Sequence, residues 1–61
     1  MSGKDFIRQA KKNGWYVARV NGSHHIMKHP EQPMKRLSVP VHGNRDLAKG
    51  TLRSLIKDAG L

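Results

Sequence analysis

Residues 15–29 read WYVARVNGSHHIMKH and decide the fold. The stretch opens with Trp15 to Val20, where aromatic and β-branched residues favour a strand. Asn21-Gly22 follows, the pair that best tolerates the positive φ angles of a type I′ turn. Ser23 to His29 is then expected to return as a second strand. The sequence therefore predicts a β-hairpin closed by a two-residue turn.

The turn at Asn21-Gly22 also fixes an expected register for this hairpin. The cross-strand pairs that follow from it are Val20 with Ser23, Arg19 with His24, Val17 with Ile26 and Trp15 with Lys28. Because residues directly opposite each other lie on the same side of a sheet, we expect Arg19 and His24 to share one face.

A third strand is predicted after the hairpin. Residues 30–33 read Pro-Glu-Gln-Pro and interrupt the strand pattern. Met34 to Val39 then alternates, with Leu37 and Val39 on one side and Arg36 and Ser38 on the other, and Pro40 ends it. The expected sheet is a three-stranded antiparallel meander.

A helix is predicted on each side of the three strands. The first begins at about Gly3, because Ser2 and Asp5 have the spacing of a capping box, and it ends at Asn13-Gly14. The second follows a loop over residues 41–49 and ends at Gly60. Its apolar residues fall at i, i+3, i+4 and i+7, the spacing of one core-facing stripe; they are Leu52, Leu55, Ile56 and Ala59.

The expected fold is thus α+β, a single domain over residues 1–61 in the order α-β-β-β-α. Both helices need an apolar surface, and packing them on one face of the sheet is the simplest way to give it to them. Which sheet face they cover is left open, because both faces of the hairpin carry apolar and polar residues.

The composition restricts the classes of function. The chain has 61 residues, 12 Lys and Arg against 4 Asp and Glu, a formal charge of +8, and no cysteine. This charge favours a polyanion or an acidic protein as partner, while the lack of cysteine excludes disulfides and thiolate sites. No apolar run approaches the roughly 18 residues of a membrane helix, and no secretion signal is recognisable, so we expect a cytoplasmic protein without a membrane partner.

Four histidines are the candidate chemical groups: His24, His25, His29 and His42. Neighbouring strand residues point to opposite faces, so His24 and His25 cannot act on one atom. His25 and His29 share a face but lie about 13 Å apart, too far for one metal ion. We therefore expect neither a metal site nor a cofactor.

His24 has two possible interpretations. A strand histidine beside a turn is most often an ordinary surface residue. It is also the side chain able to exchange protons near neutral pH, and Arg19 is placed to hold a phosphate next to it. RNA cleavage needs little more, because the 2′-hydroxyl is an internal nucleophile.

Further basic residues are candidate phosphate contacts. Lys49 and Arg53 lie near one side of the second predicted helix, close to its N-terminus, and Lys28 lies on the hairpin. A solvated helix face is the alternative to a phosphate-binding stripe. With Arg19, these residues form the predicted RNA-binding set.

Several motifs resemble one known family. They are Asn13-Gly14-Trp15, Arg19, Gly22-Ser23-His24-His25-Ile26, Lys28-His29-Pro30 and the closing run Gly50-Thr51-Leu52-Arg53-Ser54-Leu55-Ile56-Lys57-Asp58-Ala59-Gly60-Leu61. Together they resemble the HicA toxins, also called the YcfA-like family. The resemblance implies a double-stranded-RNA-binding-domain-like fold and an mRNA interferase, the toxin of a type II toxin-antitoxin system, silenced by a HicB antitoxin. It also implies that His24, directly after Gly-Ser, is the catalytic histidine.

Two other classes of function compete with a metal-independent endoribonuclease. A non-catalytic RNA-binding module would use His24 only as a contact and leave bound RNA intact. A DNA-binding repressor subunit is disfavoured, because neither helix follows the short linkage of a helix-turn-helix motif.

Overall fold

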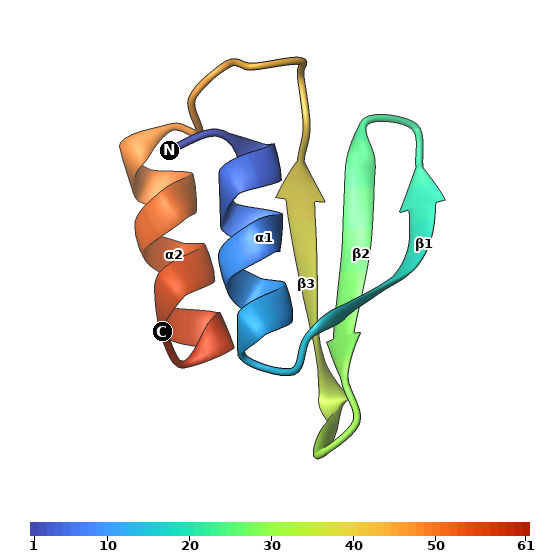
Figure 1. Ribbon diagram of the computed structural model, residues 1–61. Helices are drawn as coiled ribbons and strands as arrows, with labels where there is room; N and C mark the ends of the chain where they lie inside the picture. The colour runs from blue at the N-terminus through green and yellow to red at the C-terminus, as the bar shows by residue number, and fades with distance from the viewer.

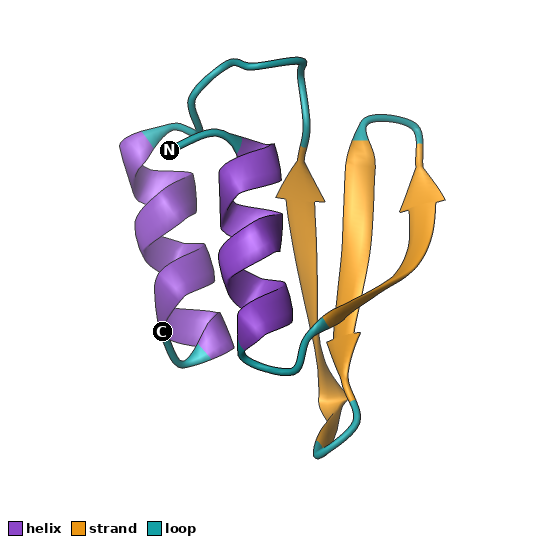
Figure 2. Ribbon diagram, viewed as in Figure 1, coloured by secondary structure: helices purple, strands orange, loops and turns teal.

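Five elements follow one another in the computed structural model, which describes all residues 1–61. They are α1 (Gly3–Lys12), β1 (Tyr16–Asn21), β2 (His24–His29), β3 (Gln32–Pro40) and α2 (Lys49–Ala59). The strands form one antiparallel sheet in the order β1-β2-β3, and the two helices form a layer beside it (Figure 1, Figure 2). The predicted α-β-β-β-α architecture of the double-stranded-RNA-binding-domain-like class is confirmed. No helix is long and apolar enough to cross a membrane.

Helix α1 begins at the capping box that the sequence predicts. The hydroxyl of Ser2 accepts a hydrogen bond from the Asp5 amide at 3.1 Å, and the Asp5 carboxylate accepts one from the Ser2 amide at 3.2 Å. These bonds satisfy two amides that a helix N-terminus leaves free. The backbone bond from Ser2, which favours the charged carboxylate, lowers the pKa of Asp5 below its ordinary value.

Helix α2 ends as predicted but begins earlier. The amide of Leu61 bonds to the Ile56 carbonyl at 3.0 Å, with Gly60 at a φ of 74°, which is the geometry of a Schellman motif. Lys49, expected in the loop, is instead the first helical residue. Its preceding residue, Ala48, has no side chain able to cap the helix, so the sequence carries no signal for this N-terminus.

The register predicted for the first hairpin is wrong by one residue at the turn. Gly22 and Ser23 form the turn, and Asn21 pairs with His24. A bulge between Val17 and Arg19 then shifts the register again. A β-bulge adds a residue on one strand only, so periodicity does not reveal it.

The prediction that Arg19 and His24 share one face of the sheet is nevertheless confirmed. Arg19 lies opposite Ile26, which is two residues from His24 and therefore on the same side of β2. The two residues are diagonal neighbours and not the direct pair that the sequence predicts.

Strand β3 is longer than the predicted Met34 to Val39. It begins at Gln32, which pairs with His29, and the register shifts before Lys28 meets Arg36. The turn is thus confined to Pro30 and Glu31, and the two strands remain paired close to that turn.

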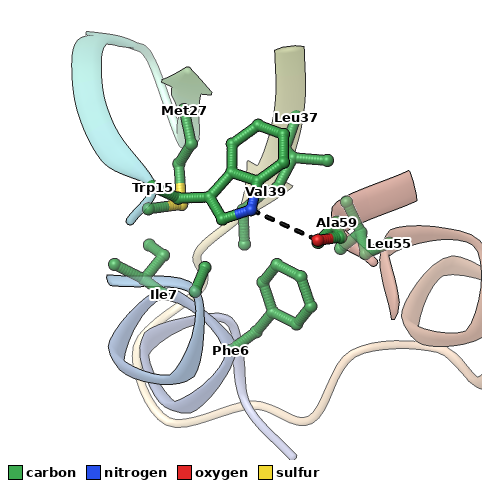
Figure 3. Close-up of a cluster of buried hydrophobic side chains, with 9 residues drawn as sticks. Phe6, Ile7, Trp15, Met27, Leu37, Val39, Leu55 and Ala59 are labelled. Atoms are coloured by element: carbon green, nitrogen blue, oxygen red, sulfur yellow. Dashed lines mark hydrogen bonds between the residues drawn. The ribbon is translucent and has the colours of Figure 1, made fainter. Parts of the chain in front are cut away.

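The core lies between the helices and one sheet face (Figure 3). It contains nine buried hydrophobic residues: Phe6, Ile7, Ala10, Trp15, Met27, Leu37, Val39, Leu55 and Ala59. The indole N–H of Trp15 donates to the Ala59 carbonyl at 3.3 Å, which links the start of the hairpin to the end of α2. The covered face is therefore the one that carries Met27, Leu37 and Val39.

Candidate active site

The other face of the sheet is not covered by either helix. Its residues form three rows across the strands, which are Asn21-His24-Pro40, Arg19-Ile26-Ser38 and Tyr16-Lys28-Arg36. We call these nine residues the open face. Along β2 and β3 they alternate with residues of the covered face, so the packing of the helices leaves the open-face side chains accessible.

His24 lies on the open face next to the turn. Its side chain is exposed, and its Nδ1 atom lies 3.1 Å from the Ser38 hydroxyl oxygen. The Nε2 atom has no hydrogen-bond partner within the protein. A ring held at one nitrogen and free at the other is suited to general acid-base catalysis at the free nitrogen.

Three cations lie together on the open face, one to two rows away from this histidine. Arg19, Lys28 and Arg36 come from three different strands and line one hollow together with Ala18 and Ile26. The protein has only two ion pairs, from the Met1 amino group to Asp46 at 3.4 Å and from Arg8 to Asp5 at 3.5 Å. The three open-face cations thus have no carboxylate partner, and their charge is available to an anion.

The predicted RNA-binding residues fall on two separate surfaces. Arg19 and Lys28 share the open face with His24. Lys49 and Arg53 line a different hollow on α2, with Leu52 and Ile56, in the layer on the opposite side of the sheet. The structure therefore does not bring the helix cations to the histidine.

The remaining histidines have other surroundings. His29 is a structural residue, since its Nε2 lies 2.8 Å from the Asn13 carbonyl oxygen and its Nδ1 accepts a hydrogen bond from the Glu31 amide. Its ring meets Trp15 edge-on, with centroids 5.3 Å apart. His25 is half-buried opposite Val39 on the covered side. No three His, Cys, Asp or Glu side chains gather into a group able to hold a metal ion.

Two residues of this site were not singled out from the sequence. Ser38, the partner of His24, and Arg36, in the cation hollow, were assigned only to the polar side of the third strand. The alternation with Leu37 and Val39 was the signal that placed them on the face shared by Arg19. Their neighbours on that face depend on the pairing of β2 with β3, which the strand sequence alone does not specify.

The fold and the open face define a small α+β protein that carries one histidine and a cluster of unpaired cations on an uncovered sheet face. The sequence profile of a family described as HicA toxin of bacterial toxin-antitoxin matches residues 3–61. The chain therefore belongs to the HicA toxin family, as its motifs suggest, and has the role of a toxin. A comparison with curated proteins finds no match.

Proposed function

We propose that this toxin is a metal-independent endoribonuclease that cleaves mRNA, with His24 as its catalytic residue. The observation that carries the proposal is the free Nε2 of an exposed histidine on a face whose cations have no acidic partners. Such an enzyme acts in the cytoplasm, where mRNA is translated, and needs no cofactor.

The chemistry requires few groups. A base removes the proton of a 2′-hydroxyl, and that oxygen attacks the adjacent phosphorus. The bond from phosphorus to the 5′-oxygen breaks, and the leaving oxygen takes up a proton. The products are a 2′,3′-cyclic phosphate and a 5′-hydroxyl, and no oxidant or metal ion enters the balance. His24 supplies one of the two proton transfers, and Arg19 stabilises the charge that develops on the phosphate oxygens.

The charge of the chain supports RNA as the substrate. A surplus of eight positive charges on 61 residues attracts a polyanion of any sequence. In this proposal Arg19 binds the phosphate beside His24, and Lys28 contacts the RNA farther along β2. Lys49 and Arg53 contact a more distant part of a longer RNA, since α2 lies on the other side of the sheet.

The partner that silences the toxin is proposed to be a HicB-type antitoxin that covers the open face. A standard interface buries about 800 Å² per partner, which is close to a fifth of the 4343 Å² accessible surface of the toxin. An acidic antitoxin surface over His24 and Arg19 would match the free cations and exclude RNA by direct competition. Protection of both residues from chemical footprinting in the complex tests this arrangement, and full exposure of both would contradict it.

The decisive experiment compares RNA cleavage by the native chain and His24→Ala. Loss of a general acid or base lowers the rate by about 10² to 10⁴, whereas an exposed strand residue alters the free energy of unfolding by only about 0.5 kcal/mol. Fragments should end in a cyclic phosphate. His42→Ala is the matched control, because it removes an exposed histidine from a loop outside the open face.

The same experiment separates the enzyme from a non-catalytic RNA-binding module. Intact RNA bound by the native chain would favour the binding module. A His24→Ala variant that cleaves at the native rate would refute the assignment of His24.

A further inference from the structure

We infer that Lys28 and Arg36, with Arg19 at the edge nearest His24, form a phosphate-binding subsite for single-stranded RNA that lies next to the position of the cleaved phosphate. The inference rests on the proposed function, which it deepens by assigning a second contact point on the substrate. It also adds Arg36, which was not among the predicted RNA-binding residues.

The three side chains converge from three strands. Lys28 lies directly between Tyr16 and Arg36 in one row of the open face, and Arg19 lies in the next row. The hollow that they line includes no acidic residue, only Ala18 and Ile26 besides the cations. Three like charges around one hollow repel each other, and a bound phosphate relieves that repulsion.

Arg36 remains unneutralised although one acid approaches it. Asp58 of α2 lines two neighbouring hollows with Arg36 but not the hollow of the three cations. No ion pair joins the two residues within 4.0 Å. The guanidinium is therefore free to make charge-assisted hydrogen bonds to a phosphate.

The subsite is separated from the catalytic position. His24 and Lys28 are four residues apart on β2 and point the same way, which places their Cα atoms about 13 Å apart. A phosphate centred in the cation hollow is thus a different one from the phosphate beside His24. One RNA strand occupying both sites must run along β2.

A single strand suits this face better than a duplex. Tyr16, at the end of the same row, is 48% exposed and offers its ring for base stacking, whereas Trp15 is only 2% exposed. Unpaired bases can stack on an aromatic ring while their phosphates follow a basic groove. In a duplex the bases are already stacked on each other, so this contact is lost.

The test compares a dinucleotide, whose single phosphodiester must sit beside His24 to be cleaved, with an oligonucleotide of about ten residues. We expect Arg36→Ala to lower kcat/KM for the long substrate by about tenfold, the value of one charge-assisted hydrogen bond. Cleavage of the dinucleotide should change less than about twofold. Arg36→Lys should lower kcat/KM for the long substrate less than Arg36→Ala does, because it keeps the charge.

Binding provides a second readout that does not depend on cleavage. In a His24→Ala background, adding Arg36→Ala should weaken binding of the long single strand about tenfold. It should also reduce the slope of log affinity against log salt concentration by about 0.7. Lys4→Ala is the matched control, since it removes one exposed charge from α1 on the covered side of the sheet. Unchanged thermal unfolding confirms that the variants fold.

Each outcome decides the inference. The subsite is supported if Arg36→Ala lowers kcat/KM for the long substrate only and Lys4→Ala does not. If the chain proves not to cleave RNA, weaker binding of the long strand by Arg36→Ala, but not by Lys4→Ala, supports the subsite by itself. An equal loss on both substrates would place Arg36 at the cleaved phosphate, and an equal loss from Lys4→Ala would indicate diffuse attraction. Either result, or no loss at all, or equal binding of duplex RNA, overturns the inference.

Discussion

Ser38→Ala removes the one side chain that is hydrogen-bonded to the ring of His24, the proposed catalytic residue. The hydroxyl oxygen of Ser38 lies 3.1 Å from His24 Nδ1, and both side chains are exposed. A hydrogen bond between neutral groups contributes a net free energy of about 0.5 to 1.5 kcal/mol. If that energy orients the ring in the transition state, its loss lowers kcat about 2- to 13-fold.

The assay measures kcat and KM separately for RNA cleavage by the native chain, Ser38→Ala and Ser38→Thr. Ser38→Ala should lower kcat and leave KM nearly unchanged, because Ser38 positions His24 and does not carry charge to the substrate. Ser38→Thr keeps a hydroxyl and suits a strand, so it should restore most of the rate. The urea midpoint should be close to native in both variants, since the residue is exposed.

Two results would refute this reasoning. A native kcat in Ser38→Ala would mean that ring orientation does not depend on the hydroxyl. A loss of 10³ or more, beyond the roughly tenfold effect of one hydrogen bond, would mean that Ser38 itself takes part in proton transfer.

Four further measurements test the fold and the proposed chemistry. Gly14→Ala should lower the free energy of unfolding, measured in urea, by about 1 to 3 kcal/mol. The reason is that the φ of Gly14 is 92° and a Cβ there would lie 2.6 Å from His29 Nε2. Gly50→Ala is the control: a Cβ at Gly50 in α2 meets open space, so this change should raise the free energy of unfolding by about 0.4 to 1 kcal/mol. Because the pKa of Asp5 is lowered, its carboxylate binds a proton less tightly in the folded protein than in the unfolded chain. The ionised carboxylate therefore stabilises the fold above the unfolded pKa, and this stabilisation is lost as the pH falls through the folded pKa. Stability measured by thermal unfolding should therefore fall less steeply below about pH 4 in Asp5→Asn than in the native chain. RNA cleavage should persist in EDTA, because the 2′-hydroxyl supplies the nucleophile; activity abolished by the chelator and restored by a divalent ion would contradict this. RNA affinity should decrease with salt at a log-log slope of about −0.7 per phosphate neutralised, and an affinity indifferent to salt would exclude binding along the phosphate backbone.

The local sequence determined most of the elements. Ser2 and Asp5 set the start of α1, Gly60 sets the end of α2, and each uses contacts only a few residues apart in the chain. The alternation of Leu37 and Val39 with polar neighbours likewise assigned the sides of β3 correctly. These features can be predicted from the sequence because a helix cap or a strand face depends on the adjacent backbone alone.

The motifs around His24 also identified the family, and the match over residues 3–61 confirms it. The count of basic residues predicted an anionic partner. Neither observation located the cations relative to the histidine, since net charge carries no information about position.

Only the tertiary structure decided which face of the sheet is covered and which residues surround His24. The turn at Gly22-Ser23 pairs Asn21 with His24 and so places Arg19 diagonal to His24, and the pairing of β2 with β3 brings Ser38 to Nδ1 and Arg36 beside Lys28. It also separates Lys49 and Arg53 from this group. The physical reason is that strand register and helix docking are chosen by burial of Trp15, Met27, Leu37 and Val39 against both helices at once. That burial is a property of the assembled chain, and no single stretch of sequence contains it.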